Sequence, residues 1–182
     1  MRGTKISRKT RETEIELSIE LDGEGAANID CQDQFLQHMM ETLTKYASFD
    51  IVLRASGDNE HHLIEDVGIV LGMGLREAIG DGAIKRRSDR VVAMDDALVM
   101  VVIDLIDRPY ADLECPDTLY THFLRSMAMS AGITLHTVQM RGFDDHHIVE
   151  ATFKALGLCL RDALASQEEL LSTKAAPEVR RG

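Results

Sequence analysis

The chain carries two copies of a short element in which an acidic residue precedes His-His-x-x-Glu, at residues 60–65 and 145–150. The copies lie 85 positions apart (146 − 61), and a single histidine precedes each one, His38 and His122, offset by 84 positions (122 − 38). If each copy opens a helix, its first histidine and its glutamate share one face, whereas the second histidine points about 100° away. Each histidine pair can then serve two different metal ions. The repeat therefore indicates a duplicated metal-binding unit.

Six imidazoles and two carboxylates recur in this way, which is enough for two metal ions with three nitrogen ligands and one oxygen ligand each. A lone histidine at a helix start more often bonds to solvent or to the helix end, but recurrence of the whole set favours metal binding. Such sites suit manganese, iron or zinc better than magnesium or calcium, and the residues leave the choice among the first three open. The eight candidate ligands are His38, His61, His62, Glu65, His122, His146, His147 and Glu150.

Composition and charge narrow the class of protein. The chain has 182 residues, 45% of them hydrophobic, which is enough for a buried core in one domain or in two small fused halves. Its 3 cysteines form no CxxC pair, which argues against a disulfide framework and for a reducing cytoplasm. The net charge of −11 disfavours nucleic-acid binding. No apolar run is long enough for a membrane span and the charged start lacks a signal-peptide core, so we expect a cytoplasmic protein.

Hydrophobic periodicity predicts the elements that position these residues. Residues 12–21 alternate apolar and polar side chains, the pattern of a half-buried strand, and a turn-forming run follows. In the first half the expected elements are strands at 12–21 and 26–30, a helix at 34–46, a strand at 51–55 and a helix at 60–79. In the second half they are strands at 90–94 and 98–106, a helix at 117–131, a strand at 134–141 and a helix at 145–165.

The common order predicts an α+β fold made by tandem duplication of a β-β-α-β-α half, with two sheets covered by helices. We expect a single unit with halves at about 1–86 and 87–166 and a C-terminal tail at 167–182, where the periodicity is lost. The apolar helix at 60–79 contains three glycines that allow close backbone approach. We favour a central core helix slightly over a subunit interface, and the two can hold together.

Short motifs extend the pattern along almost the whole chain. They lie at 8–13, 35–39, 61–66, 84–86, 107–109, 122–126, 134–136, 142, 146–154 and 172–174. In this order they resemble the imidazoleglycerol-phosphate dehydratase family, enzymes of histidine biosynthesis that remove water from an imidazolyl glycerol phosphate. The resemblance implies two manganese ions per site, ligands drawn from more than one subunit, and a homo-oligomeric cage of 24 subunits. The family's metal ligands fall on the same eight residues that the internal repeat selects.

The resemblance also assigns roles that the residues alone would not. It implies that Glu12 is the general base, although an acid at a strand start would otherwise be interpreted as an exposed surface residue. Lys154 follows His146 by eight residues, about two helical turns, so it can lie on the metal-facing side of its helix. The residues that the resemblance implies for substrate phosphate binding are Arg86, Arg108, Lys154, Ser172 and Lys174. His136 falls outside the ligand set, and Arg87 and Arg90 are expected on the solvated surface.

The chain departs from the family pattern at Gln37, Glu60, Arg87 and Asp144, without losing a ligand. The leading hypothesis is a manganese-dependent imidazoleglycerol-phosphate dehydratase. One alternative is a diverged paralogue that keeps the dimetal site but acts on another phosphorylated azole or polyol. Another is a metal-holding protein without catalysis, which retention of the base and of the phosphate-binding cations disfavours.

Overall fold

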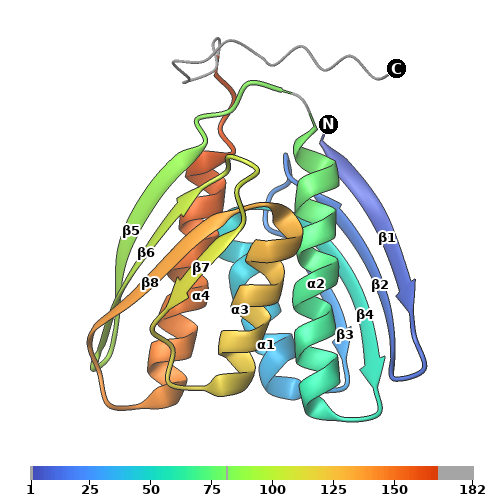
Figure 1. The fold of residues 1–182 in the computed structure, drawn as a ribbon, viewed down its shortest axis with the longest axis horizontal. Helices are drawn as coiled ribbons and strands as arrows, with labels where there is room; N and C mark the ends of the chain where they lie inside the picture. Colours follow the sequence, from blue (N-terminus) through green and yellow to red (C-terminus); the bar gives the residue numbers. More distant parts are fainter. Residues whose placement is uncertain (1, 81, 168–182) are drawn as a thin grey trace.

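Two four-stranded sheets face each other across a layer of helices in the computed structural model, which describes residues 2–80 and 82–167 (Figure 1). The first half consists of β1 (Gly3–Lys9), β2 (Thr13–Glu20), β3 (Ala27–Cys31), α1 (Gln34–Ala47), β4 (Asp50–Gly57) and α2 (Glu60–Ile79). The second half consists of β5 (Arg87–Met94), β6 (Ala97–Asp104), β7 (Tyr110–Leu113), α3 (Thr118–Ala131), β8 (Thr134–Arg141) and α4 (Asp145–Ala163). All four of these helices begin at the lower end of Figure 1.

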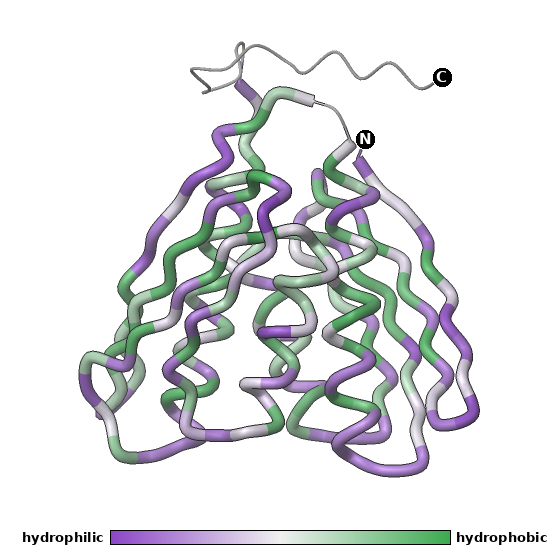
Figure 2. The backbone as a smooth tube through the Cα atoms, in the orientation of Figure 1, coloured by the Kyte–Doolittle hydropathy of each residue, from purple (hydrophilic) through white to green (hydrophobic). Residues whose placement is uncertain are grey.

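The two sheets have the same topology. Their strand orders are β1-β2-β4-β3 and β5-β6-β8-β7, and in each sheet only the last pair is parallel. Alternation along β2 turns Ile15, Leu17 and Ile19 inward, where all three are buried. In Figure 2 hydrophobic stretches run along the helices between the sheets, whereas the turns at the lower end are largely hydrophilic. The core is therefore the helical layer and the inner faces of both sheets.

The helices pair across the two halves. Helix α1 packs against α4, and α2 packs against α3, so each pair joins the first half to the second. A Cβ atom added at Gly72 of α2 would lie 2.4 Å from the Met127 carbonyl oxygen, and one added at Gly157 of α4 would lie 2.8 Å from Tyr46 Cβ. Glycine is needed at both positions because the paired backbones approach so closely. The prediction that α2 is a core helix is confirmed, since Gly68, Gly72 and Gly74 are buried.

The predicted fold class is confirmed, but each half has three strands before its first helix instead of two. The prediction missed β1, in which Ile6 is the only strongly apolar residue, and β7, which has only four residues. The first two strands predicted in the first half are β2 and β3, whereas those predicted in the second half are β5 and β6. They do not correspond, because β2 and β3 match β6 and β7. Within the described residues, no helix combines the length and apolarity needed to cross a membrane.

Candidate metal centre

Each His-His-x-x-Glu element opens a helix, as its spacing predicts. The side chain of Asn59 caps α2 by accepting the backbone N–H of His62 at 2.9 Å, and Asp144 caps α4 by accepting that of His146 at 2.9 Å. The two caps are related by the same 85-residue offset as the histidine pairs (144 − 59). Capping fixes where the helix begins, and so fixes which face the first histidine and the glutamate share.

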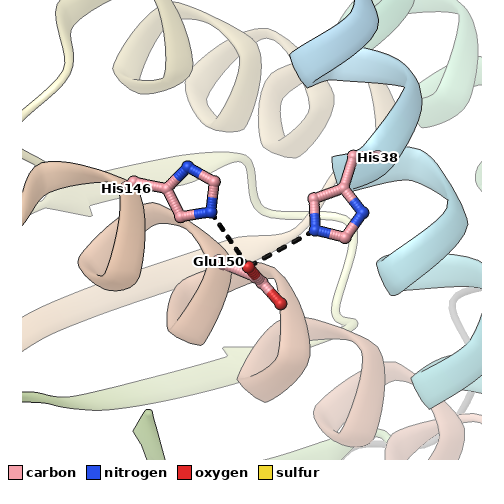
Figure 3. A group of neighbouring side chains, drawn as sticks. All are labelled: His38, His146 and Glu150. Atoms are coloured by element: carbon pink, nitrogen blue, oxygen red, sulfur yellow. Dashed lines mark ion pairs between the residues drawn. The ribbon is translucent and has the colours of Figure 1, made fainter. Parts of the chain in front are cut away.

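His38, His146 and Glu150 form a compact cluster between α1 and α4 (Figure 3). The two imidazole Nε2 atoms lie 3.4 and 3.3 Å from the same carboxylate oxygen, Oε2 of Glu150. One donor atom from each residue can be chosen so that all lie within 4.8 Å of one another, and among the described residues this is the one such set found. Glu150 is buried, at 7% exposure, while both rings are about half exposed. The cluster therefore combines ligands from both halves around one accessible point.

Lys154 contacts the same carboxylate from one helical turn further along α4. Its Nζ lies 3.0 Å from Oε1 of Glu150, so it does lie on the side of α4 that the cluster occupies. Burial raises the pKa of Glu150, but Lys154 and His38 outweigh it and leave that pKa below its ordinary value. Glu150 is therefore an ionised carboxylate at neutral pH, the form that binds a cation.

A second cluster lies between α2 and α3. Here the first half supplies a histidine and the glutamate, and the second half supplies the single histidine. His61 Nε2 lies 3.4 Å from Oε2 of Glu65, and the ring of His122 lies 5.0 Å from the ring of His61, measured between centroids. Ser126 donates its hydroxyl to Oε1 of Glu65 at 3.3 Å. This cluster is more open than the first, since the Glu65 side chain is 37% exposed.

His62 and His147 lie outside both clusters. Their rings stand at 76° and 86° to the rings of the preceding histidines, as expected for neighbours on a helix. Nδ1 of His62 lies 2.8 Å from Asp58, and Nδ1 of His147 lies 2.6 Å from Asp96. Hydrogen bonding to these two acids raises the pKa of each imidazole above its ordinary value. The sequence analysis singled out neither acid, although Asp96 follows Glu12 by the 84-residue offset that could have revealed it.

Glu12 lies directly before β2, and its carboxylate is 3.8 Å from Nδ1 of His62. The side chain is 55% exposed. The structure thus brings the candidate base to one of the paired histidines and not into either three-residue cluster. His136, as expected, is also outside the clusters and lies in β8 beside Asp112.

Arg86 and Arg108 lie at the opposite end of the subunit from the clusters. The Arg86 N–H donates to the carbonyl of Ala163, the last residue of α4, and the Arg108 carbonyl accepts from Thr134 at the start of β8. Along α4, Ala163 follows the cluster residue Glu150 by 13 residues (163 − 150), which corresponds to about 20 Å. One chain therefore does not bring these arginines to its own clusters. Ser172 and Lys174 lie outside the described residues.

Comparison with known proteins gives a consistent result. Residues 32–160 match the family model for imidazoleglycerol-phosphate dehydratase. The protein of that name from Acetivibrio thermocellus is 43% identical, with 93% of this chain and 96% of the relative covered. The one from Methanococcoides burtonii is 42% identical, with coverages of 96% and 98%.

Solved structures agree with the relatives. The crystal structure of the Pyrococcus furiosus enzyme matches with a TM-score of 0.83 and 37% identity, covering 92% of this chain and 98% of the other. The Staphylococcus aureus enzyme matches with a TM-score of 0.79 and 29% identity, with coverages of 90% and 98%. The likeness therefore extends over nearly the whole of each compared chain.

Proposed function

Because this chain belongs to the imidazoleglycerol-phosphate dehydratase family, we propose that its two clusters hold the two manganese ions of a dehydratase active site. The enzyme is a hydro-lyase of histidine biosynthesis that converts D-erythro-imidazoleglycerol phosphate to imidazole-acetol phosphate. The cluster of His38, His146 and Glu150 carries the metal proposal. Two imidazole nitrogens and one carboxylate oxygen that converge on one point fit manganese, and would also accept iron or zinc.

Each cluster supplies three ligands, and we assign the fourth to a histidine of another copy of the chain. His62 and His147 lie outside the clusters of their own chain, with their Nδ1 atoms held by Asp58 and Asp96, so neither completes a cluster in this arrangement. Both imidazoles lie at helix starts and are partly exposed, at 35% and 28%, so they can instead reach an ion held by a neighbouring subunit. This supports a homo-oligomer in which ligands from different subunits share a metal ion.

The phosphate-binding residues support the same conclusion. The substrate is a small molecule, whereas about 20 Å of α4 separates Glu150 from Ala163, beside which Arg86 lies, and Arg108 lies towards the same end. A substrate bound at the metal ions can contact these arginines only if they come from a second subunit. We therefore propose an active site built between subunits, with phosphate held by Arg86, Arg108, Lys154, Ser172 and Lys174. The number of 24 subunits rests on the family resemblance.

The outer face of the second sheet is suited to such an assembly. Along β6 the outward residues are Leu98, Met100 and Val102, and Val91 on β5 is 52% exposed. Exposed apolar surface of this kind marks protein–protein contacts. We propose that another copy of the chain covers it. Val91→Lys should then shift the metal-loaded protein to smaller species in sedimentation velocity. Ser7→Lys, at the matched position 84 residues earlier on the polar first sheet, is the control; equal behaviour of the two variants would reject this interface.

The elimination removes a proton from carbon 2 of the glycerol chain and hydroxide from the carbon next to the ring. The electron pair of the broken C–H bond forms the double bond, and the enol then becomes the ketone. We assign the proton transfer to Glu12, an exposed carboxylate 3.8 Å from the His62 ring. When bound, the metal ions supply Lewis-acid polarisation of the substrate's imidazole. The phosphate-binding cations hold the other end of the substrate, so that carbon 2 faces Glu12.

Metal-stripped protein, assayed for imidazole-acetol phosphate with and without added manganese, tests the proposal directly. We expect turnover to depend on manganese and to be lower with zinc or iron added at equal concentration. Full turnover without any metal would reject the dimetal site, and turnover restored equally by zinc would reject the specific assignment of manganese.

We also propose the cytoplasm as the location and the chain as one catalytic unit with halves at about 1–86 and 87–166. Fractionation and limited proteolysis test these two points.

A further inference from the structure

Asp96 occupies in the second half the place that Glu12 occupies in the first. Each acid directly precedes the second strand of its half, since β2 begins at Thr13 and β6 at Ala97. The two acids lie 84 positions apart (96 − 12), the same offset that relates the two single histidines of the clusters. The duplication has therefore placed a carboxylate beside the second histidine of each pair.

The carboxylate of Asp96 is fixed at both of its oxygens. Oδ2 accepts the backbone N–H of Phe143 at 2.7 Å and of Asp144 at 3.1 Å, and Oδ1 lies 2.6 Å from Nδ1 of His147. Both backbone groups donate to Oδ2, so the carboxylate acts as an acceptor, and we assign Nδ1 of His147 as the donor to Oδ1.

An imidazole protonated on Nδ1 keeps the lone pair of Nε2 for a metal ion. The ring of His147 is held by Asp96 on one side, while its Nε2 lies on the other side, 3.5 Å from the exposed carboxylate of Asp95. We propose that Asp96 is a positioning residue that fixes the tautomer and the ring plane of His147 so that Nε2 can ligate a metal ion. This inference rests on the ligand role proposed above for His147.

The first half meets the same need with different residues. Asp58 lies 2.8 Å from Nδ1 of His62, whereas Glu12 lies 3.8 Å away. The loop before α2 thus orients the ring, and Glu12 makes no closer contact with it. In the second half the acid that precedes β6, Asp96, has a shorter side chain than Glu12 and itself orients the His147 ring. This contrast separates a positioning acid from an acid that is available for proton transfer.

Asp96→Asn tests the inference with little change in shape. The amide oxygen can still accept both backbone N–H groups, so the amide nitrogen then faces Nδ1 of His147 and donates to it. Donation to Nδ1 favours the tautomer protonated on Nε2, which cannot ligate. We expect the affinity of one manganese site to fall by about 10–100-fold. The measurement is a titration of the full-length metal-free protein with manganese, in which electron paramagnetic resonance reports free Mn(II). The thermal unfolding midpoint of the metal-free variant should stay at the wild-type value.

His147→Ala and the double variant complete a cycle that separates this inference from the metal assignment. If Asp96 acts through His147, Asp96→Asn should weaken manganese binding in the wild type and have no further effect in the His147→Ala background. An Asp96→Asn protein with normal affinity, beside a weakened His147→Ala protein, would overturn the positioning role alone. An equal further loss in the His147→Ala background would overturn it too. Normal manganese affinity of His147→Ala would overturn the ligand assignment, and the inference with it.

Discussion

The two halves keep the same ligands but surround them with different partners. Glu150 in the second half is buried and paired with Lys154, whereas Glu65 in the first is partly exposed and bonded to Ser126. The position matched to Lys154 is Ile69 (154 − 85), which cannot form an ion pair. Because the two ligand sets are alike and their supports differ, the duplication can provide two metal sites with unlike properties. One carboxylate is tied to a cation that is proposed to bind phosphate, and the other is not.

The outer faces of the two sheets differ in a similar way. On β2, Glu14, Glu16 and Ser18 face outward, whereas the residues 84 positions later on β6, Leu98, Met100 and Val102, are apolar. The inner faces have no such freedom, since both must pack against the helical layer. This difference is the one expected if another copy of the chain covers the outer face of the second sheet and water covers that of the first, as proposed above.

The largest expected effect tests the different roles proposed for Glu12, which precedes β2, and Asp96, which precedes β6. Glu12→Gln removes the proposed base, so kcat should fall by about 10²–10⁴-fold. Manganese content and assembly should remain near normal, because Glu12 holds no metal ligand as tightly as Asp58 does. The measurement is kcat of the manganese-loaded variant, with metal content by mass spectrometry. A Glu12→Gln enzyme with wild-type turnover would remove Glu12 from the mechanism.

The next effect tests whether the two clusters are equivalent metal sites. His38→Ala opens the compact cluster and His122→Ala opens its counterpart, so each should lose about one of two manganese ions per site. Metal content after gel filtration measures this loss. The His38→Ala protein keeps the ion of the more open cluster, so we expect its remaining ion to be released at a lower chelator concentration than that of the His122→Ala protein. Two fully metallated variants would contradict the assignment of both clusters.

Much of this arrangement could be predicted from sequence because it is local. Helix starts at the histidine pairs, the i,i+4 contact of His146 with Glu150 and the position of Lys154 all follow from helical geometry and capping. Other features depend on distant partners. Strand β7 is recognised only by its parallel pairing with β8, and the contact of Asp96 with His147 spans 51 residues. The distance between Arg86 and the clusters could not be predicted either, because it depends on the direction in which α4 runs.

Matched glycines at the two helix crossings allow a test of the shared architecture. Gly72→Ala would place a methyl group against the Met127 carbonyl, and Gly157→Ala would place one against Tyr46 and the Leu43 carbonyl. Each should lower the free energy of unfolding by about 1–3 kcal/mol, the usual cost of overpacking. Gly82→Ala is the control, because nothing lies within 4 Å of its added Cβ. Chemical denaturation of the metal-free proteins measures the effect. If only one crossing were sensitive, the two helix pairs would not be equivalent in packing.

The smallest expected effect concerns an ion cluster that the first half lacks. Asp162 near the end of α4 lies 2.7 Å from Lys85 and 2.9 Å from Arg90, while the matched Glu77 (162 − 85) is exposed. Lys85, with Ser88 and Arg90, lowers the pKa of Asp162 from 3.8 to about 2. A lowered pKa in the folded state means that the ionised form stabilises folding. This contribution is complete above about pH 4 and disappears as the pH falls towards 2.

Asp162→Asn should therefore reduce the unfolding free energy by no more than about 1 kcal/mol at neutral pH, as for other partly exposed pairs. The gap between wild type and variant should narrow between pH 4 and pH 2, because only the wild-type group takes up a proton in that range. Urea unfolding of both metal-free proteins at each pH measures the gap. Glu77→Gln, at the matched and exposed position, is the control. A gap that stayed constant down to pH 2 would mean that Asp162 stabilises α4 through its shape and hydrogen bonds, without a contribution from its charge.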